Sequence, residues 1–318
     1  MTARALPIDP APSDCPTPLS WQQVLVAFDE EADAWEIDGI HGPIHGRSIG
    51  RGPSLVFLNP LLGNWRLMVL AAWLFRDQFR CVLYDDSSLV TRDATIVPGS
   101  IEDLVEDFWH VCDQHASSSV TVLGTGLGSA VGLAALADAG GRIAAAVLQG
   151  PLGGTRLTTA ERNLARLGSF LPGRLAHVPG FRSLMVHNHH PWFPPFDESR
   201  LAFAIETTGG LPLRVASRRA RRLDGLDLSG CLDQLATSES VPPVLLIVPE
   251  SLYDDQDPVR TPAAMAIVET VPAARVETLA GCGPLGCLTH PHRLTKLVRT
   301  FLEESLVVTP SSLPVSGD

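Results

Sequence analysis

Short apolar segments alternate with segments of helical spacing along most of the chain, and this order constrains the fold more than any other feature. Ser54–Leu58 reads Ser-Leu-Val-Phe-Leu, a continuous apolar run that is typical of a strand buried on both faces. The further predicted strands are Cys81–Tyr84, Ser119–Leu123, Ile143–Leu148, Val244–Val248 and Arg275–Leu279. Helices are predicted between or after them at Trp65–Phe75, Ile101–His115, Leu127–Ala137, from Thr261-Pro262, and at Leu294–Glu304. This alternation predicts an α/β fold in which helices cover both faces of a mostly parallel sheet.

The pattern also divides the chain. Residues 1–34 are expected to be a proline-rich tail, and residues 307–318 a disordered C-terminal tail. Two short strands, Trp35–Ile40 and Ile44–Ile49, are predicted to form a hairpin that opens the core. The alternation stops after the strand at 143–148, so residues 35–150 and 241–306 are assigned to the core and residues 151–240 to an inserted block. Such a block is expected to cover the carboxyl edge of the sheet as a helical lid.

Charge and cysteine content exclude some function classes. The 318 residues carry 24 Lys and Arg against 35 Asp and Glu, a formal charge of −11, which argues against a nucleic-acid partner. The six cysteines form no CxxC pair, so reduced thiols in a cytoplasmic protein are expected. No signal peptide is predicted, because the proline-rich residues 1–19 lack an apolar core. No membrane-spanning segment is predicted either, because the apolar stretch at 120–136 is interrupted by glycines and is shorter than the ~20 residues that a membrane helix needs.

The third predicted buried strand runs into Leu123-Gly-Thr-Gly-Leu-Gly-Ser129 and then a helix, which resembles the nucleophile elbow of the α/β-hydrolase fold superfamily. Other segments resemble its motifs in the same order. Leu58-Asn-Pro-Leu61 stands at the oxyanion loop, Tyr84-Asp85 at the end of the next strand, Asp257-Pro-Val-Arg-Thr-Pro262 at the acid loop and Gly281–Pro291 at the histidine loop. The resemblance covers roughly residues 36–304 and implies an α/β-hydrolase-type sheet with a helical lid inserted after the sixth strand.

Two of the three triad positions implied by this resemblance hold residues that cannot perform the chemistry. The nucleophile position is Gly126 and the histidine position is Pro284, whereas the acid position, Asp257, keeps a carboxylate. A serine nucleophile needs an imidazole to take its proton and a carboxylate to orient that imidazole. Glycine has no side chain and proline no titratable group, so Ser-His-Asp hydrolysis is not expected.

The shape of the elbow is nevertheless predicted to persist. The nucleophile residue in this fold has a positive φ, which glycine adopts freely. By the same resemblance, backbone N–H groups of Leu61 and Leu127 would form an oxyanion-type site, and Asn59 would line the pocket with them.

Other residues were weighed as replacements for the triad. Thr125, Ser129, Ser87 and Ser88 are interpreted as structural rather than nucleophilic, and Cys282 and Cys287 as buried, inert thiols. His290 and His292 follow the histidine position, but too far along the chain to replace it.

Two polar groups in the inserted block have competing interpretations. The run His187-Asn-His189-His190 can ligate a metal, but solvent-facing histidines are preferred and no metal or other cofactor is expected. The arginines at 214, 218, 219, 221 and 222 have helical spacing and are interpreted as a solvated helix face, with an acidic partner or phosphate as the alternative.

The leading functional hypothesis is a catalytically degenerate protein that binds a small apolar molecule or a protein partner in the lid-covered cleft. The alternatives are an enzyme that uses no triad (a lyase, cyclase or isomerase, with Asp257 as acid or base) and an ester or amide hydrolase with a relocated nucleophile. The sequence leaves the substrate class and the oligomeric state open.

Overall fold

The computed structural model describes residues 19–39, 42–90, 100–151, 157–194, 197–238, 240–249, 262–271 and 274–307. The described residues form an eight-stranded sheet with the order β1-β2-β4-β3-β5-β6-β7-β8. Strand β2 is antiparallel to β1 and β4, and the strands from β4 to β8 pair in parallel. The strands are β1 (Asp33–Gly39), β2 (Gly42–Ile49), β3 (Ser54–Leu58), β4 (Arg80–Asp85), β5 (Val120–Thr125), β6 (Ile143–Gln149), β7 (Val244–Pro249) and β8 (Arg275–Leu279).

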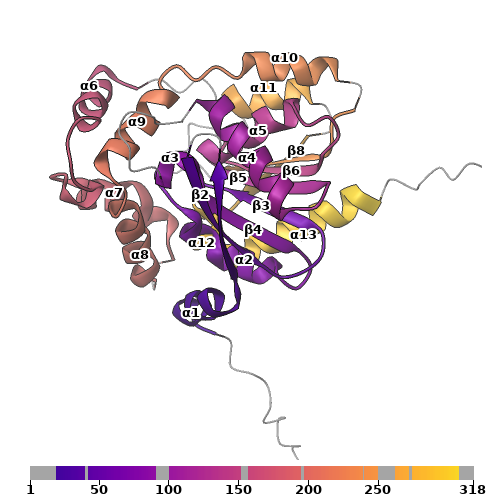
Figure 1. Cartoon of the computed structure of the whole chain (residues 1–318), viewed down its shortest axis with the longest axis horizontal. Helices are drawn as coiled ribbons and strands as arrows, with labels where there is room; N and C mark the ends of the chain where they lie inside the picture. Colours follow the sequence, from indigo (N-terminus) through magenta and orange to yellow (C-terminus); the bar gives the residue numbers. More distant parts are fainter. Residues whose placement is uncertain are drawn as a thin grey trace, which may run out of the picture.

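Helices cover both faces of the sheet (Figure 1). One apolar layer lies between the sheet and α1 (Trp21–Glu31), α2 (Val69–Phe75), α12 (Gly286–Thr289) and α13 (Pro291–Val307). The other layer lies beneath α4 (Ile101–His115), α5 (Leu127–Ala137), α10 (Ser229–Thr237) and α11 (Pro262–Thr270). Central strands such as β3, whose five residues are all buried, therefore face helices on both sides, which explains their continuous apolar sequence.

The segment between β6 and β7 supplies the remaining large helices. Its helices α6 (Thr159–Gly168), α7 (Phe181–His189), α8 (Glu198–Gly209) and α9 (Leu213–Leu223) lie together beside the sheet in Figure 1. Helix α10 instead packs on α5 and α11. Short helical turns complete the described chain: η1 (Trp65–Met68), α3 (Ser87–Val90), η2 (Leu175–His177) and η3 (His190–Trp192). The expected insertion after the sixth strand is confirmed.

Most predicted elements are confirmed, with strand ends extended by one or two residues. The main correction concerns residues 21–31, which were assigned to a proline-rich tail but form α1. A capping box starts this helix, since the Ser20 hydroxyl accepts from the Gln23 amide and the Gln23 side chain accepts from the Ser20 amide. Phe28 in this helix is fully buried, so α1 belongs to the core. In the described part of the chain, no helix has both the length and the apolar character needed to span a bilayer.

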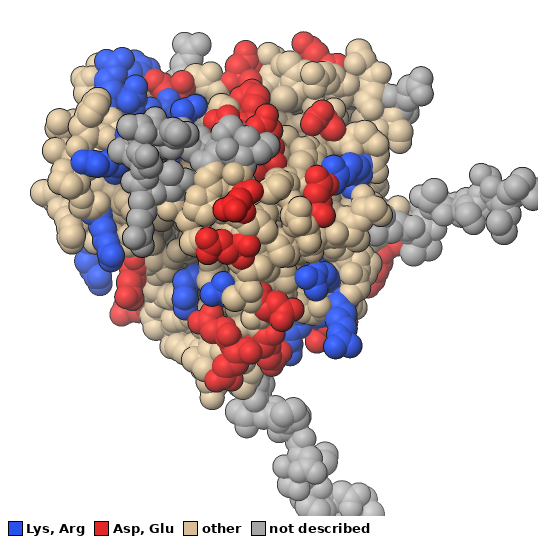
Figure 2. All heavy atoms as spheres, in the orientation of Figure 1, with Lys and Arg blue, Asp and Glu red and all other residues tan. Residues whose placement is uncertain are grey.

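Acidic and basic side chains are unevenly spread over the face shown in Figure 2. Acidic groups gather down the middle and along the lower edge, and basic groups gather on the left, over the inserted helices. Charged side chains are therefore unevenly distributed over this face, although the net charge of the chain is negative.

Candidate functional site

The turn between β5 and α5 has the backbone shape expected of an elbow. Gly126 stands at its apex with φ 55° and ψ −110°, and its amide donates a 2.9 Å hydrogen bond to the Gln149 carbonyl oxygen at the end of β6. A Cβ atom added to Gly126 would meet no heavy atom of the described residues within 4 Å. The predicted positive φ is confirmed, and the apex has room for a side chain that the sequence does not supply.

The two glycines beside the apex are required by close packing. A Cβ atom on Gly124 would overlap the Gly128 carbonyl, and one on Gly128 would overlap the Leu58 carbonyl at the end of β3. Both glycines therefore permit the close approach of α5 to the strands that carry the site. This agrees with the prediction that the shape of the elbow persists.

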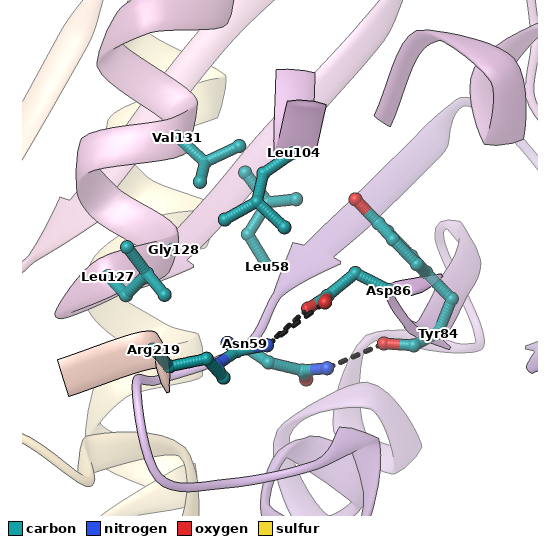
Figure 3. Close-up of a pocket in the computed structure, with 9 residues that line it drawn as sticks. All are labelled: Leu58, Asn59, Tyr84, Asp86, Leu104, Leu127, Gly128, Val131 and Arg219. Carbon is teal, nitrogen blue, oxygen red and sulfur yellow. Dashed lines mark hydrogen bonds and ion pairs between the residues drawn. The ribbon is translucent and has the colours of Figure 1, made fainter. Parts of the chain in front are cut away.

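The loop after β3 lies next to the start of α5. Asn59 and Leu127 line one small cavity of about 20 Å³, together with Tyr84, Asp86 and Arg219 (Figure 3). A space of this size holds about one water molecule. Leu127 is the first residue of α5, so its N–H has no acceptor within the helix and stays available as a donor. Leu61, by contrast, is fixed through its carbonyl oxygen, which accepts a 3.0 Å hydrogen bond from Arg219 Nε.

A buried ion pair connects the inserted helices to this loop. Arg219 of α9 and Asp86, which follows β4, are both buried, and Arg219 Nη1 lies 2.9 Å from the Asp86 carboxylate. The same nitrogen donates to Ser88 Oγ at 2.7 Å. The interpretation of the arginine cluster as a solvated face is therefore wrong for Arg219, although Arg214, Arg221 and Arg222 are exposed.

Asp85, next to this ion pair, has a strongly perturbed carboxyl group. Burial raises its pKa to about 7, and the negative charge of Asp86 adds to the rise. Hydrogen bonds from the Trp65 amide (3.0 Å) and the Asn59 side chain (3.3 Å) act in the opposite direction. The carboxyl group therefore changes its charge near neutral pH, at the base of the loop that holds Asn59.

Side chains from other parts of the chain pack against the loop at Gly283 and Pro284. Gln149 Nε2 donates a 3.0 Å hydrogen bond to the Gly283 carbonyl, directly before Pro284. A Cβ atom on Gly283 would overlap the ring of Trp192 from η3, so this tryptophan lies against the loop. The inserted segment thus contacts Gly283, the residue directly before Pro284.

The hydroxyl and thiol groups weighed as replacement nucleophiles are engaged in structural contacts. Ser129 Oγ donates to the carbonyl oxygens of Gly124 (2.8 Å) and Gln149 (2.7 Å). Ser87 Oγ donates to Asp107 at 2.6 Å, Ser88 Oγ donates to Asp86, and Thr125 is buried beside Gln149. Burial raises the pKa of Cys282 to about 11 and that of Cys287 to about 12, so both stay protonated thiols near neutral pH.

The histidines of the sequence lie away from the elbow cavity or lack metal-binding partners. His187 and His190 are exposed, but His189 is half-buried and burial lowers its pKa, which corrects the expectation that all three face solvent. Within the described residues, no group of three or more His, Cys, Asp and Glu side chains could hold a metal ion. His290 and His292 line a groove beside α13 rather than the elbow cavity. Asp257 lies outside the described residues.

Three residues that contribute to the site were not recognised from the sequence: Arg219, Gln149 and Trp192. A signal for Arg219 was present, because Val215, Arg219 and Leu223 are spaced by four and so share one helix face. Gln149 is the last residue of buried strand β6, and its position at this end of the strand is a signal that it lies near the site. Its partner Gly283 is 134 positions away, so the contact itself could not be predicted. No sequence pattern pairs Trp192 with Gly283.

Comparison with known proteins identifies the fold. No family model and no curated protein matches the chain, but many solved structures do. A hydrolase from Pseudomonas aeruginosa PA01 matches with a TM-score of 0.65 and 18% identity over 85% of this chain and 98% of its own. An enol-lactonase from Burkholderia xenovorans LB400 matches with a TM-score of 0.66 and 17% identity over 85% of this chain and 100% of its own. A thermophilic esterase from Thermogutta terrifontis matches with a TM-score of 0.66 and 17% identity over 86% of this chain and 99% of its own.

These similarities, together with the strand order and the elbow between β5 and α5, define the class: the chain has the α/β-hydrolase fold. At 17–18% identity, these solved structures establish the architecture alone, and the chemistry of this chain has to be inferred from its own residues.

Proposed function

We propose that this chain is a catalytically degenerate α/β-hydrolase-fold protein that works by binding. The single observation that carries the proposal is the glycine at the apex of an otherwise regular elbow. Gly126 keeps the φ of 55° that presents a nucleophile in this fold, yet offers no atom that can attack a carbonyl. Pro284 at the histidine position removes the base independently.

Binding at the cleft is supported by what remains there. None of the described residues crowds the position of a side chain at Gly126, and the Leu127 amide has no acceptor within its helix. Trp192 brings the inserted segment against Gly283. In this proposal the inserted helices act as a lid, and a small apolar molecule lies between them and the elbow. A backbone donor and an open apex are suited to hold a carbonyl group without activating it.

A protein partner is the second binding mode in the proposal. The inserted helices and the turn after α6 expose large apolar side chains: Leu164, Leu167, Phe170, Leu171 and Leu184. Phe170 is 75% exposed, which is unusual for a phenylalanine. Several large apolar side chains exposed in one segment of the chain are suited to an interaction site.

A non-triad enzyme is the alternative function, and one observation favours it. The pKa of Asp85 is raised to about 7, which matches the requirement for a general acid or base near neutral pH. Asp257, outside the described residues, is the other carboxylate available for such a role. In a lyase, cyclase or isomerase, the change Asp257→Ala or Asp85→Asn would abolish turnover, whereas a binding protein would keep its affinity.

The reduced state of the cysteines fits a cytoplasmic protein. Cys81, Cys112, Cys231, Cys282 and Cys287 are all free thiols. Scattered unpaired cysteines are expected where glutathione keeps thiols reduced.

Treatment with a fluorophosphonate and with 1-naphthyl acetate tests the proposal. The wild-type chain should show no serine labelling and no ester hydrolysis above buffer, while 1-naphthyl acetate raises its melting temperature. Gly126→Leu should fill the apex and remove this shift, whereas Gly140→Leu, at a glycine with φ 51° and equally open space, should retain it. Labelling or ester turnover by the wild-type chain would overturn the proposal that the chain is catalytically degenerate.

A further inference from the structure

A second concave region lies on the α1, α2 and α13 side of the sheet, away from the elbow cavity. Its larger part is a groove of about 690 Å³, bounded by residues of α1, α2, α8 and the start of α13. A smaller part of about 300 Å³ continues along α13 and shares Leu74 and His292 with the first. Figure 1 places α1, α2 and α13 on the same face of the sheet.

The floor of this α13 groove is apolar. Trp21, Val24, Leu70, Trp73 and Leu74 line it from α1 and α2. Lining residues extend from position 289 to position 303, and at 1.5 Å per helical residue this corresponds to about 20 Å. The groove is therefore long enough for an extended apolar chain or a fused aromatic ring system, and its larger part is in the size range of small-molecule sites.

The rim of the groove is cationic, in contrast to the net charge of the chain. Basic side chains Arg76, Arg200, Arg293, Lys296 and Arg299 line it, and the acidic ones among the lining residues are Asp197 and Glu303. Asp197 pairs with Arg200, but no carboxylate of the described residues lies within ion-pair distance of Arg293, Lys296 or Arg299. The positive charge of these three side chains is not neutralised within the described chain.

Buried polar atoms without a described partner also occur in this helix and directly before it. His290 Nδ1, Thr295 Oγ1 and Arg299 Nε are buried and have no hydrogen-bond partner among the described residues. Thr295 is only 3% exposed and lines the smaller part of the groove. A buried polar atom left unpaired is costly, so a ligand or water that supplies a partner would be stabilised there.

The N-terminus of α13 adds a further attraction for negative charge. Pro291, His292 and Arg293, the first residues of this 17-residue helix, line the groove. The free backbone N–H groups and the dipole of a long helix favour an anion at this end. The nearby positive charges of Arg293 and Arg200 also lower the pKa of His290, after burial, which is consistent with a positive potential.

We propose that the α13 groove binds an amphipathic anion, with its carboxylate, sulfonate or phosphate head at the start of α13 and its apolar body against Trp73 and Leu74. The head group accepts hydrogen bonds from Arg293, from Lys296 and from the free amides of the first helical turn. The apolar body lies against half-buried Leu74 and beside Trp73, whose mostly buried ring is covered by the Arg76 guanidinium at 3.7 Å. This site is independent of the elbow cavity and does not depend on the function proposed for it.

The test uses 8-anilinonaphthalene-1-sulfonate with the full-length protein, and N-phenyl-1-naphthylamine as the same aromatic body without the charge. The sulfonate should bind with one site per chain and be displaced by decanoate but not by decan-1-ol. The neutral probe should bind at least tenfold more weakly. Equal affinity of the charged and neutral probes would overturn the proposal, because the cationic rim would then contribute nothing.

Variants locate the bound sulfonate. Arg293→Gln/Lys296→Gln should raise its Kd about tenfold, the loss expected when charge-assisted hydrogen bonds are removed. Leu74→Glu, which places a carboxylate on the apolar wall shared by both parts of the groove, should also weaken binding of the sulfonate. The control Arg166→Gln/Arg182→Gln changes two exposed arginines beside the apolar side chains of α6 and α7 and should leave the Kd unchanged. Weakening by the control and not by the groove variants would place the sulfonate on the inserted helices and overturn the proposal.

Discussion

Arg219 Nη1 lies 2.9 Å from each of the two carboxylate oxygens of Asp86, and so fixes α9 of the inserted segment to the turn after β4. Arg219 Nε at the same time donates to the Leu61 carbonyl. One guanidinium therefore holds together the inserted helices, the loop after β3 and the turn after β4. Because both partners are buried, the pair is far more sensitive to the loss of one member than a surface pair would be.

Replacing Arg219 by methionine should destabilise the fold strongly. The change leaves the Asp86 carboxylate buried without a counter-ion and frees the Leu61 carbonyl, for which a loss of about 3–5 kcal/mol is expected. Urea unfolding measures it, with Arg214→Met, an exposed arginine of the same helix, as the control. Asp86→Asn/Arg219→Met should recover part of the loss; equal stability of Arg219→Met and Arg214→Met would show that the buried pair contributes nothing.

Placing serine at the elbow should cost stability without creating an esterase. Gly126 has φ 55° and ψ −110°, a conformation whose cost to a residue with a Cβ atom is about 1–3 kcal/mol. The open space around the apex adds no steric cost, so Gly126→Ser should fold and lose an amount in this range. Gly140→Ser, at φ 51° and also in open space, is the matched control for backbone strain. A much larger loss for Gly126→Ser than for Gly140→Ser would contradict an open apex.

The same variant separates the missing hydroxyl from the missing base. Because Pro284 supplies no imidazole, Gly126→Ser alone should remain unlabelled by a fluorophosphonate. Rapid labelling of this single variant would show that another group already acts as the base.

Gly128 should tolerate no side chain. Its added Cβ atom would overlap the backbone carbonyl of Leu58, which cannot move without disturbing the centre of the sheet. Gly128→Ala should therefore lose at least about 3 kcal/mol or fail to fold. Gly230→Ala is the matched control, since Gly230 is also helical but has open space, and there alanine should be neutral or stabilising by up to about 1 kcal/mol. Similar unfolding midpoints for the two variants would refute the close approach of α5 to β3.

The centre of the sheet could be predicted from the sequence because burial on both faces makes strands such as β3 continuously apolar, whereas the edge strand β8 carries polar residues as well. Ser54–Leu58 and Arg275–Leu279 match β3 and β8 residue for residue, and the helices Ile101–His115 and Leu127–Ala137 match α4 and α5. The position of the insertion followed from the interruption of the same pattern. Helix α1 was missed although Ser20 and Gln23 have the spacing of a capping box, because the proline-rich residues before it suggested a continuous tail.

The side chains that complete the site could be predicted only in part. The elbow depends on glycines within five residues of one another, so its shape is a local property that the sequence contains. The contacts of Arg219 with Asp86 and of Gln149 with Gly283 join positions more than 130 residues apart. The first contact depends on how the insertion packs on the core, and the second on how the two parts of the core on either side of the insertion come together. Helical spacing alone does not decide which of five arginines turns inward unless the apolar neighbours Val215 and Leu223 are considered with it.

Asp85 should make stability fall as the pH rises towards neutrality. Its pKa in the folded chain is about 7, well above the value near 4 of an exposed aspartate, so between these values the folded state binds more protons than the unfolded state. The stability associated with the protonated carboxyl is fully present below about pH 4 and is lost as the pH rises through 7. Asp85→Asn imitates the protonated form and still offers an acceptor to the Trp65 amide, so at pH 8 it should be more stable than the wild type by on the order of 3 kcal/mol. At pH 4 the two should be equal.

Urea unfolding between pH 4 and 8 measures the difference, and Asp233→Asn, at an exposed aspartate of α10, should run parallel to the wild type over the whole range. If Asp85→Asn runs parallel as well, the carboxyl of Asp85 is ionised in the folded chain throughout, and it is excluded as an acid or base that works near neutral pH.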